Sequence, residues 1–66
     1  MKNNIRVERA IKRLTQQQLA DLVNVSRQTI NAMELGKYVP STVLALKIAR
    51  VFEKTVNDIF QLEEED

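Results

Sequence analysis

The sequence predicts an all-α fold, a compact domain of five helices, and three observations support this. Apolar residues recur at intervals of three and four along most of the chain, which is the spacing of one face of a helix. Residues suited to the start of a helix begin four of the segments: Thr15, Ser26, Ser41 and Thr55. No segment has a convincing strand pattern, although the first and last few residues could pair as a minor sheet.

The length of the chain limits its organisation. A chain of 66 residues cannot enclose two separate cores, so we expect a single domain over residues 1–66. Residues 63–66 are all acidic, and we expect this tail to be frayed. Burial is limited at this size, so the free energy of unfolding is expected to be small.

A first amphipathic helix is expected between residues 5 and 14. Charged residues are interspersed there with apolar ones, and the charged side chains of such a helix face solvent. The apolar positions at helical spacing are Ile5, Val7, Ala10, Ile11 and Leu14.

Residues 15–36 predict two short helices joined by a tight turn. The first covers about residues 16–23, and Thr15 with Gln18 has the form of a capping box at its start. Asn24 can end this helix because asparagine tolerates a left-handed backbone better than most residues. The apolar residues expected to be buried are Leu19, Ala20, Leu22 and Val23.

The second helix of this pair begins at Ser26, a good N-cap, and continues to about Leu35. Ile30 and Met33 are expected to face the core, and Gly36 supplies the C-terminal cap. The helix therefore has one apolar side, while its opposite side carries amide, hydroxyl and guanidinium groups.

Two further helices complete the predicted fold. Residues 37–40 are a loop, and a wide apolar face predicts a central core helix from Ser41 to Phe52. A short fifth helix is expected from Thr55 to about Phe60. The apolar residues of the fourth helix are Val43, Leu44, Leu46, Ile48, Ala49, Val51 and Phe52.

Composition argues against several classes of function. The chain has no histidine, no cysteine and one glycine, so it offers no evident metal-ligand set, disulfide, phosphate-binding glycine loop or general acid–base pair. We therefore expect neither an enzyme nor a bound cofactor. No apolar run approaches a membrane span, and the N-terminus lacks the apolar core of a signal peptide. A cytoplasmic protein is the expectation.

Charge is unevenly distributed along the chain. The formal net charge is only +1, but residues 1–54 hold all ten lysines and arginines against four carboxylates, a balance of +6. Residues 55–66 hold five carboxylates and no basic residue, a balance of −5. A basic body with an acidic end suits attraction of phosphates to one face. An ordinary mixed surface would give the same numbers.

The apolar pattern of residues 15–36 has a known counterpart. Counted from Gln16, apolar residues occupy positions four, five, eight, ten, fifteen and eighteen: Leu19, Ala20, Val23, Val25, Ile30 and Met33. With one helix before it and two after it, the pattern resembles the DNA-binding domain of the phage lambda and 434 repressor and Cro family, the XRE-type helix-turn-helix proteins. The resemblance covers about residues 5–60. The stretches SRQTIN, E-x-G and PSTVLALKIA also look like the short stand-alone bacterial transcriptional regulators of that family.

The resemblance implies a set of DNA contacts. The third helix of this family enters the major groove, which places Arg27, Gln28 and Ala32 near base edges. Arginine can pair with guanine and glutamine with adenine, whereas alanine can touch only a thymine methyl group. Residues implied at phosphates or at the edge of the contact are Gln16, Gln17, Ser26, Thr29, Asn31, Lys37 and Tyr38. Ser26 could instead serve only as a cap, and Tyr38 could cover the core or a partner subunit.

The resemblance also implies an ion pair between Arg9 and Glu34, with a structural role in orienting the third helix. Asn24 departs from the family pattern, which usually has glycine there. Because asparagine can adopt the same backbone, we expect the turn to be retained.

A single helix reads about half of a typical operator, so we expect a symmetric homodimer on double-stranded DNA. The fifth helix and its exit carry more apolar surface than the end of a domain usually shows. The residues expected at the dimer interface are Val39, Val56, Ile59, Phe60 and Leu62, with Tyr38 beside them. Alternatively, Ile59 and Phe60 simply close the core.

The sequence thus predicts a dimeric, sequence-specific transcriptional regulator, a repressor rather than an activator, since occupancy of a promoter suffices for repression. A regulatory protein partner could relieve it. The alternative is a protein-interaction module of the same fold, antitoxin-like or anti-activator, but exposed apolar residues would then be expected on the third helix.

Overall fold

The computed structural model describes all 66 residues, and it contains five helices and one two-stranded sheet. The all-α, five-helix prediction is confirmed. The helices are α1 (Ile5–Lys12), α2 (Gln16–Val23), α3 (Arg27–Glu34), α4 (Thr42–Phe52) and α5 (Val56–Ile59). The strands are β1 (Lys2–Asn3) and β2 (Phe60–Gln61).

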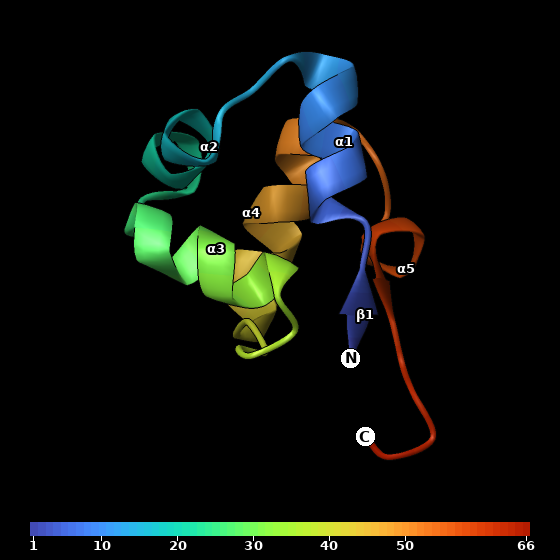
Figure 1. Cartoon of the computed structure of the whole chain (residues 1–66). Coiled ribbons are helices and arrows are strands. Elements are labelled where there is room, and N and C mark those ends of the chain that lie inside the picture. The colour runs from blue at the N-terminus through green and yellow to red at the C-terminus, as the bar shows by residue number, and fades with distance from the viewer.

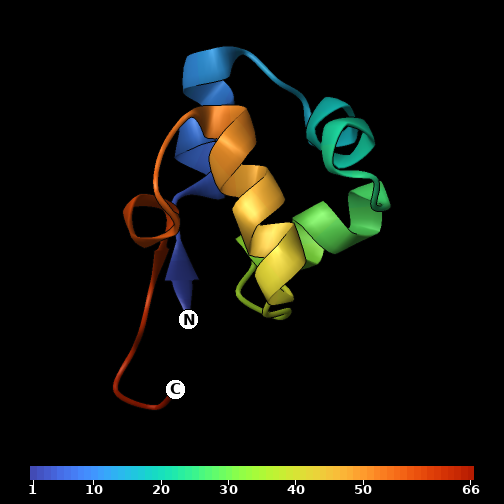
Figure 2. The same cartoon turned by 180° about the vertical axis from the view of Figure 1, so that it is seen from behind.

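Helix α4 is the centre of the arrangement. It lies between the α2–α3 pair on one side and α1, α5 and the sheet on the other (Figures 1 and 2). Helices from both sides contribute to a single core. The buried apolar residues are Ile5, Leu19, Ala20, Val23, Ile30, Met33, Leu44, Ile48, Ala49, Phe52, Ile59 and Phe60.

The capping residues explain where the helices begin and end. The Thr15 hydroxyl accepts from the Gln18 amide, and the Gln18 side chain accepts in return from the Thr15 amide. Asn24 ends α2 in the left-handed region with φ 62°. Gly36 follows α3 with φ 74°, a backbone conformation that favours glycine. All three local predictions are confirmed.

The predicted apolar face of α1 is partly wrong. Ile5 is buried, but Val7 and Ile11 are 58% and 66% exposed. The buried neighbour is instead Glu8, whose Oε2 accepts from the Lys54 Nζ at 2.8 Å. An ion pair with a residue after α4 thus allows a carboxylate to occupy a core-facing position, and α1 is rotated accordingly.

Three further apolar residues that the sequence places in the core lie at the surface instead. Leu22 on α2 and Val43 and Leu46 on α4 are all more than half exposed. The apolar faces of both helices are therefore narrower than the sequence suggests. None of the helices has the length and apolar character needed to cross a membrane.

The minor sheet does form. Strands β1 and β2 pair antiparallel, with Lys2 opposite Gln61 and Asn3 opposite Phe60. Residues 63–66 are not frayed as expected. The Glu63 amide donates to the Asp66 Oδ2 at 2.9 Å, and the carboxylates of both residues lie 3.1 Å from the Met1 amine. Hydrogen bonds to these carboxylates raise the pKa of that amine.

Candidate nucleic-acid interface

The α2–α3 pair forms the outer part of the molecule on the side away from the sheet. Figure 1 shows α2 nearly end-on while α3 runs across the view, so the two helices cross steeply. Only Asn24, Val25 and Ser26 link them. The Val25 amide donates to the Ala20 carbonyl at 3.0 Å, and the Ser26 hydroxyl accepts from the Thr29 amide. The turn is thereby fixed by hydrogen bonds at both of its ends.

Helix α3 has two distinct faces. Ile30 and Met33 are fully buried, and they anchor the inner face in the core. The outer face presents Arg27, Gln28 and Asn31, all exposed. Gln28 makes no side-chain hydrogen bond within the protein, so its amide is free to bind another molecule. Thr29 and Ala32 lie between the two faces and are half-buried.

An ion pair joins α1 to the C-terminal end of α3. The Arg9 Nε donates to the Glu34 Oε2 at 2.7 Å, and the Nη2 donates to the Oε1 at 3.1 Å. The third donor, Nη1, bonds the Leu14 carbonyl at 2.9 Å. The hydrogen bond to Glu34 is the main cause that raises the pKa of Arg9. A two-pronged pair of this kind fixes the position of α3 relative to α1.

Gln16, the first residue of α2, extends this ion pair to the outer face. Its Nε2 donates to the Glu34 Oε1 at 3.2 Å and to the Asn31 Oδ1 at 3.1 Å. Its Oε1 accepts from the Arg27 Nη1 at 3.4 Å. We call Arg9, Gln16, Arg27, Asn31 and Glu34 the polar network. It connects α1, α2 and α3 without a break.

The polar network borders a hollow of about 270 Å³, and sequence reasoning missed one residue there. Arg6, one turn before Arg9 on α1, lines the same hollow as Gln16 and Asn31. Arg6 is exposed and forms no ion pair in the structure. Its basic charge at an i, i+3 spacing from Arg9 was a usable signal, because residues at that spacing share a helix face.

Other predicted contact residues lie less close to the polar network. The Gln17 Nε2 donates to the Asp21 Oδ1 at 2.9 Å, so its side chain is held along α2. Lys37 and Tyr38 lie in the segment after α3, where Tyr38 is 46% exposed. The first amides of α2 and α3 have no partner inside their helices and form favourable positions for an anion.

The predicted dimer residues divide into two groups. Ile59 and Phe60 are 0% and 6% exposed, and both belong to the hydrophobic core of the chain itself. Their burial favours the alternative that they close the core, and Phe60 also lines an apolar hollow beside Val39 and Val56. Val39 and Leu62 are exposed. Val39 and Val56, together with Leu46, line an apolar hollow of about 230 Å³.

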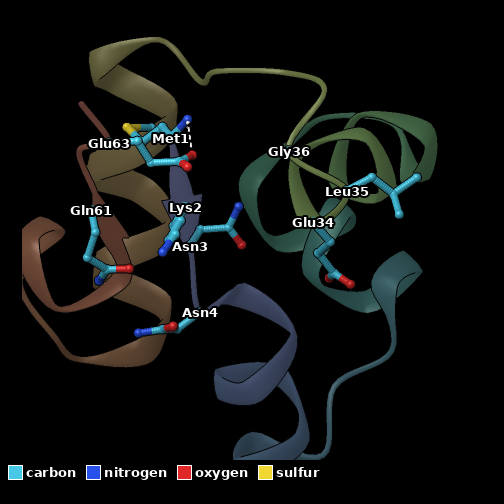
Figure 3. A pocket seen from close by; sticks show the side chains of 9 residues that line it. All are labelled: Met1, Lys2, Asn3, Asn4, Glu34, Leu35, Gly36, Gln61 and Glu63. Carbon is cyan, nitrogen blue, oxygen red and sulfur yellow. Dashed lines mark ion pairs between the residues drawn. The ribbon is translucent and has the colours of Figure 1, made fainter. Parts of the chain in front are cut away.

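A third hollow, which is mainly polar, separates the sheet from the end of α3 (Figure 3). Its lining includes Asn3, Leu35, Gly36 and Glu63. The Asn3 Nδ2 donates to the Met33 carbonyl at 2.7 Å, and this bond ties β1 to the last turn of α3. Strand β1 thus helps to hold the last turn of α3 in place.

Comparison with known proteins assigns this arrangement to a family. The profile of the helix-turn-helix family matches residues 5–59, from the start of α1 to the end of α5. The chain belongs to the XRE-type helix-turn-helix family. Its α2–α3 pair is the helix-turn-helix, and the family is one of DNA-binding transcriptional regulators.

Full-length relatives support this membership. An uncharacterized HTH-type transcriptional regulator of Methanocaldococcus jannaschii is 50% identical over 66 residues, which is all of both chains. The HTH-type regulator YgzD of Bacillus subtilis is 47% identical, again over all of both chains. The crystal structure of the clp gene regulator ClgR from Corynebacterium glutamicum superposes with a TM-score of 0.76 at 28% identity, covering 82% of this chain. The chain spans 57% of ClgR.

Proposed function

We propose that this helix-turn-helix regulator is a repressor that binds an inverted-repeat operator as a homodimer, with α3 of each copy in the major groove. Arg27 and Gln28 read base edges, while Ser26, Lys37 and the backbone amide of Gln16 contact phosphates. The observation that carries the proposal is the outer face of α3, where exposed side chains with hydrogen-bonding groups stand on a helix anchored by Ile30 and Met33.

The same observation favours DNA over the protein-interaction alternative. A protein-binding α3 would present apolar side chains at its exposed positions, whereas Arg27, Gln28 and Asn31 are all polar. Base edges and phosphates are hydrogen-bonding partners that suit these groups. Arg6, beside Gln16 at the neighbouring hollow, adds a further positive charge for phosphate.

The proposed dimer interface is the apolar hollow and its margin. Its apolar lining includes the exposed Val39 and Leu46, the half-buried Val56 and the buried Phe60, which a second copy would cover. Leu62, exposed just after β2, is proposed to extend this interface. To reach half-sites on the same side of the duplex, the two α3 helices of the dimer must lie about 34 Å apart, one turn of DNA.

Binding to a DNA fragment from around the protein's own gene tests the proposal, with protection mapping at increasing salt. We expect protection of a short inverted repeat, with affinity that falls steeply as salt rises because basic side chains displace counterions from phosphates. The double variant Arg27→Ala with Gln28→Ala is expected to abolish protection while the unfolding transition stays unchanged. Lys47→Ala, on α4, is the matched control for loss of a surface charge.

Two results would overturn the proposal: no selective protection by the natural protein, or protection that the double variant retains. Repression is tested separately with a reporter gene behind the protected sequence, where increased transcription would contradict it. Sedimentation of the protein and of Leu46→Asp tests the interface. We expect a dimer for the first and a monomer with normal helix content for the second.

A further inference from the structure

We propose that Glu34 is a positioning residue for base recognition, because it fixes the amide orientation of Gln16 and thereby makes the surface around Arg27 and Asn31 a surface of hydrogen-bond donors. This inference rests on the proposed DNA-binding function. It gives Glu34 a role beyond its ion pair with Arg9.

The chemistry of the neighbours determines the orientation of the Gln16 amide. A carboxylate can only accept hydrogen bonds, so the group facing Glu34 must be the Gln16 Nε2, at 3.2 Å. A guanidinium can only donate, so the group facing Arg27 must be the Gln16 Oε1, at 3.4 Å. A rotated amide would place acceptor against acceptor on one side and donor against donor on the other.

This orientation uses both donors of the Gln16 amide. One N–H is directed to Glu34, and the other to the Asn31 Oδ1 at 3.1 Å. Gln16 therefore has no side-chain donor left for a phosphate, so a phosphate at the start of α2 is bound by backbone amides and by Arg6. The side chain of Gln16 serves as an acceptor that holds Arg27.

The orientation of the Gln16 amide also fixes the orientation of the Asn31 amide. Its Oδ1 already accepts from Gln16, so its Nδ2, which has no partner in the protein, carries the donors that remain available. The outer face thus offers donors from Arg27 and from Asn31. These groups suit positions that expose acceptors in the major groove, above all guanine with its N7 and O6. They do not suit the amino groups of cytosine and adenine.

The test is selection from a random duplex library by the full chain, followed by sequencing. The natural protein is expected to enrich guanine at the position faced by Arg27. In the Glu34→Gln variant the residue can donate as well as accept, so the Gln16 amide is no longer held in one orientation. Guanine enrichment at that position should fall roughly two- to ten-fold, the size of one hydrogen bond, while preferences read by Gln28 stay unchanged.

Arg9→Gln is the matched control. It breaks the same ion pair but leaves the Glu34 carboxylate in place to orient Gln16, so we expect lower stability and a smaller loss of guanine preference than in Glu34→Gln. Equal loss of preference in both variants would overturn the inference, since Glu34 would then act only through the placement of α3. An unchanged preference in Glu34→Gln would overturn it as well. Absence of any base preference in the natural protein would instead overturn the proposed function.

Two further measurements keep the inference testable if Glu34→Gln does not fold. Gln16→Leu removes the connection and leaves the ion pair intact, and it should lower guanine enrichment by a similar factor. In the natural protein without DNA, the side-chain amide protons of Gln16 should exchange with water more slowly than those of Gln28, which has no partner. Equal exchange rates would contradict the proposed hydrogen bonds.

Discussion

The two ends of α3 differ in how firmly they are held. At the C-terminal end, Met33 is fully buried and its carbonyl accepts from Asn3, while Glu34 is paired with Arg9. At the N-terminal end, Arg27 has one long hydrogen bond and Gln28 has none. The firmly held end aims the helix, and the free end is available to DNA. Substitutions at the first should therefore lower stability, whereas substitutions of Arg27 and Gln28 at the second should affect binding alone.

The largest expected effect lies at the anchored face. Ile30→Ala removes a side chain that is 0% exposed and leaves a cavity, so the free energy of unfolding should fall by about 2–4 kcal/mol. Urea unfolding followed by circular dichroism measures this. A loss below 1 kcal/mol would show that the α2–α3 pair is not anchored through the core. Gln28→Ala is the exposed control and should change stability by less than about 0.5 kcal/mol.

Next comes the ion pair that holds the C-terminal end. Arg9→Gln leaves the Glu34 side chain, only 7% exposed, without its main partner. The free energy of unfolding should fall by about 1–3 kcal/mol. Lys12→Gln, on the same helix as Arg9, breaks an exposed pair with Glu53 at the end of α4 and should lower the free energy of unfolding by less than about 1 kcal/mol. If both substitutions lowered the free energy of unfolding equally, the expectation that the buried ion pair contributes more than the exposed one would be wrong.

At the free end, Arg27→Ala should change binding without changing folding. Loss of a bidentate contact with guanine corresponds to about 1–3 kcal/mol, roughly five- to 150-fold in affinity for the operator. Titration of labelled operator DNA measures it. A parallel drop in the urea midpoint would mean that Arg27 supports α3 through Gln16 more strongly than its exposure suggests.

Ser26 is the structural residue of the free end, and a smaller effect is expected from it. Its hydroxyl accepts from the Thr29 amide at 3.2 Å, so Ser26→Ala should reduce stability by about 1 kcal/mol. Ser26→Asp keeps the cap and should retain stability, but its charge should weaken DNA binding. If Ser26→Asp binds the operator as tightly as the natural protein, no phosphate lies near this cap.

The smallest effect is a pH dependence at α5, remote from α3. A hydrogen bond from the Thr55 amide, with a second from its hydroxyl, lowers the pKa of Asp58. Because the folded-state pKa is below the unfolded value of about 3.9, this stabilisation is present above that value and is lost as the pH falls through the folded pKa. The urea midpoint of Asp58→Asn should therefore change less between pH 6 and pH 3 than that of the natural protein. Identical acid dependence would contradict this.

Local signals predicted the helix-turn-helix well. The capping box at Thr15, the left-handed Asn24 and the cap at Ser26 all depend on residues close in sequence, so the bounds of α2 and the start of α3 follow from them. The polar face of α3 was predictable for the same reason, because helical periodicity places Arg27 and Gln28 opposite Ile30.

Predictions that depended on distant partners were less successful. Glu8 is buried because Lys54, far along the chain, neutralises it, and no local pattern contains that information. The exposure of Val7 and Ile11 follows from the same rotation of α1. Burial of Phe60 depends likewise on pairing with β1. The hydrogen bonds of Gln16 could not be predicted either, because they need the crossing geometry of α2 and α3.

The pairing of β1 with β2 has a consequence for how the protein forms during synthesis. Residues 60–61 must leave the ribosome before they can pair with residues 2–3. Strand β1 is therefore unpaired while the helices between the two strands are being synthesised. Asn3 also supports the last turn of α3 through the Met33 carbonyl. The anchoring of α3 through β1 is therefore completed only once residue 61 has been translated, and chains truncated before β2 should hold α3 less firmly.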